Sequence, residues 1–151
     1  MRKLRADIVL RIAINMHKKL KIYTDGGARG NPGPAGIGVV ILDGKKKIKE
    51  LKKYIGVATN NVAEYTAVIY ALQAALMEKA DEVELNLDSE LVAQQLEGEY
   101  KVKNLNIKPL FEQTLHLISG FKKFSIKQIP REENKDADKL VNKAINLSAL
   151  L

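Results

Sequence analysis

Apolar residues in the first half of the chain occur in short blocks separated by polar or glycine-rich segments. The blocks at 20–25, 37–42 and 48–57 are rich in β-branched residues and predict strands. Between the first two, GGARGNPGPAG (26–36) is dense in glycine and proline and predicts a loop. The Asp-Gly pair at 43–44 is a strong hairpin signal. Three adjacent strands joined by short turns therefore predict an antiparallel meander.

Helical and strand patterns alternate through the remainder of the chain. The predicted elements are a helix at 61–79, a strand at 83–88, helices at 89–98 and 107–118, a strand at 124–129 and a helix at 134–148. Thr59 or Asn60, Ser89 and Asn134 are suitable N-caps, and Gly98 is a suitable stop. The order βββαβααβα predicts one α/β domain. Its five-stranded mixed sheet has three antiparallel strands plus two parallel additions and is flanked by helices.

Residues 1–15, MRKLRADIVLRIAIN, stand apart from this pattern. Basic residues followed by an apolar run resemble a signal peptide, but Asp7 and Arg11 interrupt the run and no small-residue cleavage site follows. Met16 is a second methionine just before the first strand. We expect 1–15 to be a dispensable extension or an upstream start, and 16–151 to be the folded domain. No apolar run approaches a membrane span, and nothing suggests an obligate interface, so we expect a cytoplasmic protein that is a monomer.

Composition narrows the available chemistry. The 151 residues include no Cys, which excludes disulfides, thiolate metal sites and thiol nucleophiles. Two histidines, His17 and His116, are too few for a multi-histidine zinc site. The net charge of +7 favours an anionic partner. However, residues 1–21 carry seven bases and one acid, so +6 of this excess is N-terminal.

Three carboxylates occupy positions that suggest a site. Glu64 lies three residues before Ala67 and four before Val68, on the apolar stripe of the 61–79 helix. A carboxylate there is costly unless it is paired, protonated or metal-bound, although near a helix start it could instead reach solvent. Asp25 and Asp88 end strands, where ligand sites of α/β sheets gather, yet either could be a turn residue. If the three converge, their oxygen ligands suit Mg²⁺ or Mn²⁺.

The last predicted helix offers two further acids, Asp136 and Asp138. Both flank its apolar stripe, on opposite sides, so spacing alone does not choose between them. Asp136 falls in the first turn after Asn134, where an acid is favourable for purely structural reasons. Asp138 is therefore the better functional candidate.

Five segments together resemble type 1 ribonuclease H, in its compact archaeal and bacterial form. They are YTDGGARGNPGPAGIG (23–38), TNNVAEY (59–65), LDSELV (87–92), GEYKVKN (98–104) and PREENKDADKL (130–140). The resemblance covers about 20–148 and implies the ribonuclease H-like fold. It also implies hydrolysis of the RNA strand of RNA–DNA hybrids to 5′-phosphate products.

The resemblance implies a catalytic and metal-binding set of four acids, matched here by Asp25, Glu64, Asp88 and Asp138. Two Mg²⁺ ions, or Mn²⁺ as a substitute, would be held by this set. One activates the attacking water, and the other stabilises the leaving 3′ oxygen. Without metal, like-charge repulsion within the set should raise at least one pKa.

Substrate contacts are implied by the same resemblance. Asn31, Asn60 and Asn61 would face the RNA minor groove, where 2′-OH groups distinguish RNA from DNA. Thr59 and Asn104 match a pocket that grips a DNA phosphate. Turn formation by Asn31 and capping by Asn60 or Asn61 are the structural alternatives.

Three departures from the family pattern concern substrate grip. The loop before the last helix, QIPREEN (128–134), contains no His, and Arg131 is the candidate substitute. A Trp-rich basic protrusion is absent, leaving Lys101, Lys103 and Lys108 to supply part of that surface. Val57 stands where certain members place an Arg. These losses predict weaker binding of substrate and not a different reaction.

Two other functions stay open at this point. One is a non-catalytic module that binds the hybrid or double-stranded RNA, against which the presence of all four acids argues. The other is a related acidic-site nuclease that acts on double-stranded RNA or branched junctions, because one fold can serve several polynucleotide substrates.

Overall fold

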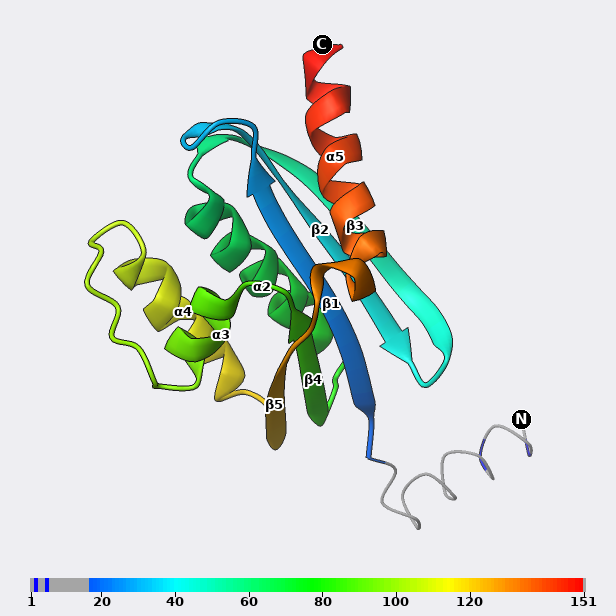
Figure 1. Ribbon diagram of the computed structural model, residues 1–151. Coiled ribbons are helices and arrows are strands. Elements are labelled where there is room, and N and C mark those ends of the chain that lie inside the picture. The colour runs from blue at the N-terminus through cyan, green and yellow to red at the C-terminus, as the bar shows by residue number, and fades with distance from the viewer. Residues whose placement is uncertain (1, 3–4, 6–16, 151) are drawn as a thin grey trace.

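A five-stranded sheet with strand order β3-β2-β1-β4-β5 forms the centre of the molecule (Figure 1). The computed structural model describes residues 2, 5 and 17–150, so the extension predicted at 1–15 lies almost entirely outside the described residues. The strands are β1 (Lys19–Ala28), β2 (Gly33–Asp43), β3 (Lys46–Ala58), β4 (Glu82–Leu87) and β5 (Lys123–Gln128). β1, β2 and β3 pair antiparallel, and β4 and β5 are added in parallel. The predicted mixed sheet is thus confirmed.

Helices cover both faces of this sheet. They are α2 (Asn60–Met77), α3 (Glu90–Leu96), α4 (Lys108–Ile118) and α5 (Lys135–Ala149), with a short 3₁₀ turn, η1 (Arg131–Glu133), before the last. α2, α3 and α4 lie on one side, whereas α5 crosses the other side over β1, β2 and β3 (Figure 1). Among the helices described, none combines the length and the apolar character needed to cross a membrane.

The glycine-rich segment at 26–36 is mostly strand, so its prediction as a loop was wrong. β1 continues to Ala28 and β2 begins at Gly33, with Gly27 paired to Gly36 across the two strands. A side chain on Gly26 would lie 2.2 Å from the backbone of Ala63 in α2. Here glycine permits a helix backbone to approach the sheet, and composition alone does not distinguish that role from a turn.

The main core lies between the sheet and α2. Leu20, Ile22, Val39 and Ile41 from the sheet pack with Leu72 and its neighbours on α2, and all five are fully buried. Tyr65 on α2 is also fully buried, and its hydroxyl donates a hydrogen bond to Oε1 of Gln95 on α3 at 2.7 Å. These contacts fix α2, and with it Glu64, against the sheet.

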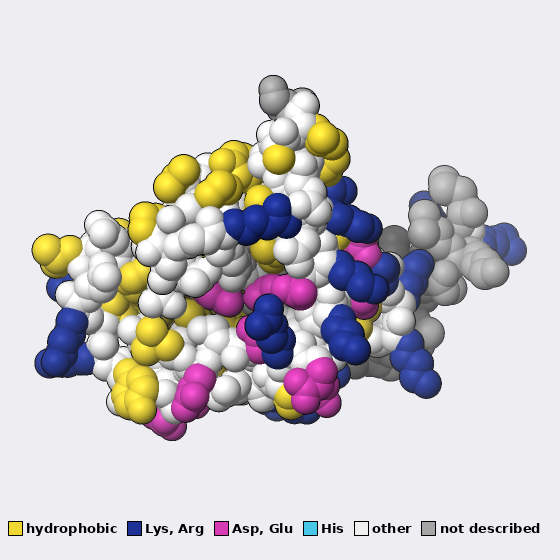
Figure 2. Space-filling view, turned by 45° about the horizontal axis from the view of Figure 1, so that its top comes forward, with side chains coloured by type: hydrophobic (Ala, Val, Ile, Leu, Met, Phe, Trp, Pro, Cys, Tyr) yellow, Lys and Arg dark blue, Asp and Glu magenta, His cyan; other side chains and the backbone are white. Residues whose placement is uncertain are grey.

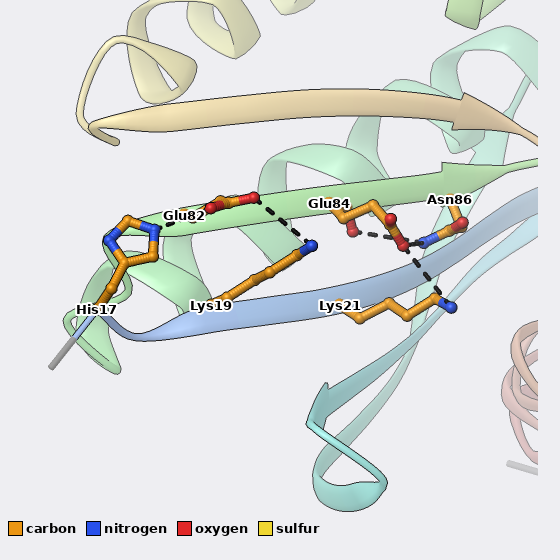
Figure 3. A network of polar contacts seen from close by, with 6 residues as sticks. All are labelled: His17, Lys19, Lys21, Glu82, Glu84 and Asn86. Carbon is orange, nitrogen blue, oxygen red and sulfur yellow. Dashed lines mark hydrogen bonds and ion pairs between the residues drawn. The ribbon is translucent and has the colours of Figure 1, made fainter.

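Polar pairs on the opposite face set the alignment of β1 with β4 (Figure 3). Lys19 pairs with Glu82 at 3.6 Å and Lys21 with Glu84 at 3.7 Å. The Asn86 amide, 1% exposed, donates to the Ile22 carbonyl and to Oε2 of Glu84, each at 3.2 Å. A one-residue slip would turn these side chains into the core. In this register Tyr23 pairs with Asn86, so the end of β4 lies beside the part of β1 that leads into Asp25.

Candidate active site

Four carboxylates from four elements line one cavity. Asp25 lies near the end of β1, Asp88 directly follows β4, Glu64 lies on α2 and Asp138 on α5. The cavity measures about 560 Å³, and Arg29 also lines it. Figure 2 shows acidic side chains in the middle of one face and others at its lower edge, with Lys and Arg side chains next to the central ones. The structure thus places in one cavity the three acids whose convergence the sequence suggested, together with Asp138.

Three of these carboxylates are close enough to share a cation. Ligand oxygens of Asp25, Glu64 and Asp88 lie within 4.8 Å of one another. Asp25 is 8% exposed and Glu64 is 9% exposed, so Glu64 does not reach solvent as its structural alternative required. Glu64 Oε2 is buried without a hydrogen-bond partner. A buried, unpartnered carboxylate oxygen in an all-oxygen cluster fits a hard divalent cation.

Burial and mutual repulsion both favour the protonated carboxyl groups. Burial raises the pKa of Asp25 to about 7, and the charge of Asp88 and contact with Asp138 act in the same direction. Burial, followed by the charges of Asp25 and Asp88, raises the pKa of Glu64 well above its ordinary value. A raised pKa within the set was predicted from repulsion, but burial proves to be the larger cause.

The effects on the pKa of Asp88 oppose one another more than those on Asp25 and Glu64. Burial raises its pKa, whereas a hydrogen bond from Asn134 and the positive charge of Arg131 lower it. Arg131 lines the same cavity, which places the candidate substitute for the missing loop histidine beside this carboxylate. The site therefore contains a positive charge close to the Asp88 carboxylate.

Asn134 holds several parts of the site together, a role that the sequence did not reveal. It occupies the N-cap position of α5, as predicted, but its side chain makes no capping hydrogen bond. The residue is 1% exposed, and its Nδ2 donates to the Thr24 carbonyl, next to Asp25, at 2.8 Å. Its own carbonyl accepts the Asp138 amide at 3.1 Å. Asn134 thus connects β1, Asp88 and the first turn of α5.

The two acids at the start of α5 have different surroundings. Asp138 lines the carboxylate cavity, whereas Asp136 is exposed and lines a separate 370 Å³ cavity with Lys47 and Tyr23. The choice of Asp138 from the sequence agrees with this placement.

Apart from Arg131, the residues predicted to contact substrate gather in a second groove next to the carboxylate cavity. Its volume is about 590 Å³, and its lining includes Asn31, Thr59, Asn60, Asn61 and Asn104. Asn60 also lines the carboxylate cavity, so the two hollows share a border. Thr59 caps α2 by accepting the Val62 amide at 3.2 Å. The groove brings these residues together, and their contacts with substrate stay a prediction.

Three asparagines in this region are oriented by backbone amides. Asn31 Oδ1 accepts the Asn60 amide at 3.0 Å, and Asn60 Oδ1 accepts the Ala28 amide at 2.9 Å. Asn104 Oδ1 accepts the Asn106 amide at 2.8 Å. Because each carbonyl oxygen is engaged, each side-chain NH₂ is left as a hydrogen-bond donor. Donors of this kind suit phosphate oxygens, 2′-OH groups and the acceptors of a minor groove.

Residues 23–144 match the protein family described as reverse transcriptase-like. The ribonuclease HI of Halobacterium salinarum is 39% identical over 141 residues, which cover 93% of this chain and 71% of that protein. A bifunctional protein of Mycobacterium tuberculosis is 42% identical over 133 residues, or 87% of this chain and 36% of that protein. The chain thus spans about a third of the length of the mycobacterial relatives.

Solved structures of similar proteins superimpose on most of the chain. The halobacterial RNase H1 structure is 40% identical with a TM-score of 0.82, covering 85% of this chain and 98% of that one. LC11-RNase H1 in complex with an RNA/DNA hybrid is 47% identical with a TM-score of 0.81, covering 86% and 99%. Both likenesses cover more than four fifths of this chain and nearly all of the other one.

Proposed function

Since the chain belongs to the ribonuclease HI family, we propose that it is an endonuclease that hydrolyses the RNA strand of RNA–DNA hybrids to 5′-phosphate products. The observation that carries the proposal is the convergence of Asp25, Glu64 and Asp88 within 4.8 Å, with Asp138 lining the same cavity. A module that only binds nucleic acid gains nothing from buried acids, which repel phosphate and cost stability.

The four carboxylates are the residues that would hold divalent cations, with Mg²⁺ first and Mn²⁺ as a substitute. The all-oxygen donor set and the unpartnered Glu64 Oε2 support this assignment. When bound, two such ions supply an activated water and stabilise charge on the attacked phosphate. Asn134 and the packing of α2 hold the ligands in place beforehand, so that little reorganisation accompanies the reaction.

Arg131 places a positive charge near Asp88 at the edge of the cavity. We assign it to binding of the substrate phosphate or product. A guanidinium is planar and can donate two parallel hydrogen bonds to the oxygens of one phosphate.

We assign the groove of Asn31, Thr59, Asn60, Asn61 and Asn104 to the minor groove of the hybrid and to a phosphate of the DNA strand. The support is its set of asparagine NH₂ groups, which are left as donors because their Oδ1 atoms accept backbone amides. Val57, 72% exposed, lines the same groove where some family members have an Arg. The phosphate pocket is consequently neutral, and its contribution to binding should depend little on salt.

Cleavage of matched duplexes tests the proposal. The full chain is incubated with an RNA–DNA hybrid, an RNA duplex and a DNA duplex of one sequence, each with Mg²⁺, Mn²⁺ or EDTA. We expect cleavage of the RNA strand of the hybrid with either metal, ends bearing 5′-phosphate, and no cleavage in EDTA. Tight binding of the hybrid without cleavage would favour a binding module. Preference for the RNA duplex or for a branched junction would favour a related acidic-site nuclease.

A further inference from the structure

Arg29 lies in the turn between β1 and β2, at the rim of the carboxylate cavity. Its side chain is exposed and lines the same cavity as the four acids. Within residues 17–150, its guanidinium makes no ion pair with a carboxylate. One side-chain contact restrains it, from Nη2 to Oδ1 of Asn142 on α5 at 3.5 Å. Most of its five N–H donors are therefore available to a ligand.

Asn142 connects this arginine to the fourth carboxylate. It stands one helical turn after Asp138, and its Nδ2 donates to the Asp138 carbonyl at 3.1 Å. The same nitrogen lies 3.5 Å from Asp138 Oδ2. Because the NH₂ group faces Asp138, the carbonyl oxygen faces Arg29. A polar chain thus runs from the β1–β2 turn through α5 to the acidic cluster.

Resting on the proposed function, we propose that Arg29 binds a phosphate of the cleaved RNA strand next to the scissile phosphate, and that Asn142 positions both Arg29 and Asp138. The strand that is cut must enter the carboxylate cavity, and Arg29 lines that cavity but not the groove that contains the residues assigned to the DNA-strand phosphate. A guanidinium is planar and binds phosphate oxygens through two parallel hydrogen bonds.

The chemistry of the cavity requires such a group. Neighbouring phosphates of the bound strand approach a cluster of acids whose charge is compensated only where cations bind. Arg131 supplies one fixed positive charge from η1, and Arg29 supplies another from a different element. Holding the guanidinium by an uncharged amide keeps it in place without neutralising it, whereas a carboxylate partner would compete with the phosphate. Arg29 is accordingly a substrate-binding residue and Asn142 a positioning residue.

The first experiment measures steady-state cleavage and salt dependence. We expect Arg29→Ala to raise KM by about 10-fold while kcat changes less than about threefold, as for loss of one charge-assisted contact. The slope of log Kd against log salt, measured in an Asp25→Asn background, should fall by about 0.7 to 0.9. Lys45→Ala is the matched control. It removes one charge at the β2–β3 turn, at the opposite end of the sheet from Asp25, and should change neither KM nor the slope.

The second experiment locates the contact on the substrate. Single neutral methylphosphonates, each on a 2′-O-methyl nucleotide, are placed along the RNA strand or the DNA strand, with the same nucleotide and an ordinary phosphate as reference. The unsubstituted protein should lose about 10-fold in affinity at one RNA position next to the cleavage site, and Arg29→Ala should lose nothing further there.

Asn142→Ala should raise KM and also lower kcat, whereas Asn146→Ala, an exposed change one turn later, should do neither.

Equal losses for both proteins at every phosphate, or an unchanged salt slope in Arg29→Ala, would overturn the assignment of Arg29. If the position at which Arg29→Ala loses no further affinity lies on the DNA strand, the assignment of Arg29 to the RNA strand would be overturned. Both results are distinct from failure of the proposed function, which would show as an unsubstituted protein that does not cleave the hybrid at all.

Discussion

Asp25 and Glu64 are nearly buried acids placed within reach of each other, an arrangement that costs free energy in any protein without a bound cation. The sequence predicted Glu64 because a charged residue interrupted an apolar helical stripe. It favoured Asp138 because Asp136 already had a structural explanation. Asn134 was different, since an Asn before a helix is an ordinary cap and only the fold shows its amide turned inward to β1.

Asp25→Asn should abolish cleavage of the hybrid, by at least about 10³-fold in kcat, while hybrid binding is retained. The amide has nearly the shape of the carboxyl group but lacks the charge that a cation requires. Cleavage assays and binding by fluorescence anisotropy measure the two effects. Asp136→Asn, an exposed acid two positions before Asp138, is the control and should behave as the unsubstituted protein. Cleavage retained by Asp25→Asn would remove Asp25 from the metal-binding set.

The metal-free protein should lose stability as the pH rises. The pKa of Asp25 is about 7 in the folded protein and about 3.9 in an unfolded chain. The folded state therefore binds the proton more tightly, and the stability that this gives is complete below about pH 4 and lost by about pH 7. Thermal unfolding in EDTA between pH 4 and 8 measures the decline.

The same melts in Asp25→Asn provide the control. An amide does not ionise, so the decline should be smaller and the midpoint at pH 8 higher than in the unsubstituted protein. Mg²⁺ at pH 8 should raise the midpoint of the unsubstituted protein more than that of the variant. Identical pH profiles for the two proteins would show that Asp25 carries no raised pKa.

Asn134→Ala should lower both stability and activity. The change leaves the Thr24 carbonyl without its donor and removes a hydrogen bond from Asp88, at a cost of about 1–3 kcal/mol in unfolding free energy. We expect kcat to fall about 10-fold or more, because Asp88 and Asp138 are no longer held in position relative to each other. Urea unfolding and cleavage kinetics measure these effects, with Asn146→Ala as an exposed control on the same helix. A fall in stability with unchanged kcat would restrict Asn134 to a structural role.

At the scale of elements, the sequence patterns located every strand and α-helix from β1 to α5 within a few residues, but not the 3₁₀ turn η1. The error was concentrated in the segment 26–36, where glycine and proline suggested a loop and the structure continues both strands. Composition shows only that these residues are glycines, which suit a turn as well as a strand. The structural reason for glycine here is close contact with helices that are distant in sequence. Inside the segment, a Cβ on Gly36 would lie 3.0 Å from the Val141 carbonyl oxygen on α5, and just beyond it a Cβ on Gly38 would lie 2.2 Å from the Ala137 carbonyl oxygen. Close helix approach of this kind brings the acids of α2 and α5 to the sheet.

Gly38→Ala should therefore separate α5 from the sheet. We expect a loss of about 2 kcal/mol or more in unfolding free energy, because the backbone must move to admit the methyl group. Cleavage should also fall, since Asp138 moves with α5. Gly27→Ala is the control, since its methyl group would meet Val141 Cγ1 at an ordinary 3.7 Å. Urea unfolding compares the two, and equal stability would show that α5 does not need the close approach.

At the scale of the whole molecule, net charge is a poor guide to where substrate binds. The total of +7 lies mostly in residues 1–21, whereas 22–151 carry 18 bases and 17 acids. The candidate site concentrates acids in its cavity, with Lys and Arg side chains next to them (Figure 2). The pattern that matters is thus local, and only the fold brings its parts together.

Removing residues 1–15, so that the chain begins at Met16, should leave the fold and the cleavage reaction intact. Contacts with the rest of the domain begin at residue 17. His17 Nε2 lies 2.8 Å from Glu82 Oε1, and the Lys18 backbone amide donates to the Asp81 carboxylate at 2.8 Å. The thermal midpoint should change by less than about 3 °C, equivalent to roughly 1 kcal/mol.

The deletion removes four bases and one acid and lowers the net charge from +7 to +4. Binding to a DNA duplex at low salt should consequently weaken several-fold, while kcat on the hybrid stays within about twofold. Loss of folding, or a fall in kcat of about 10-fold or more, would instead make the N-terminal segment part of the domain.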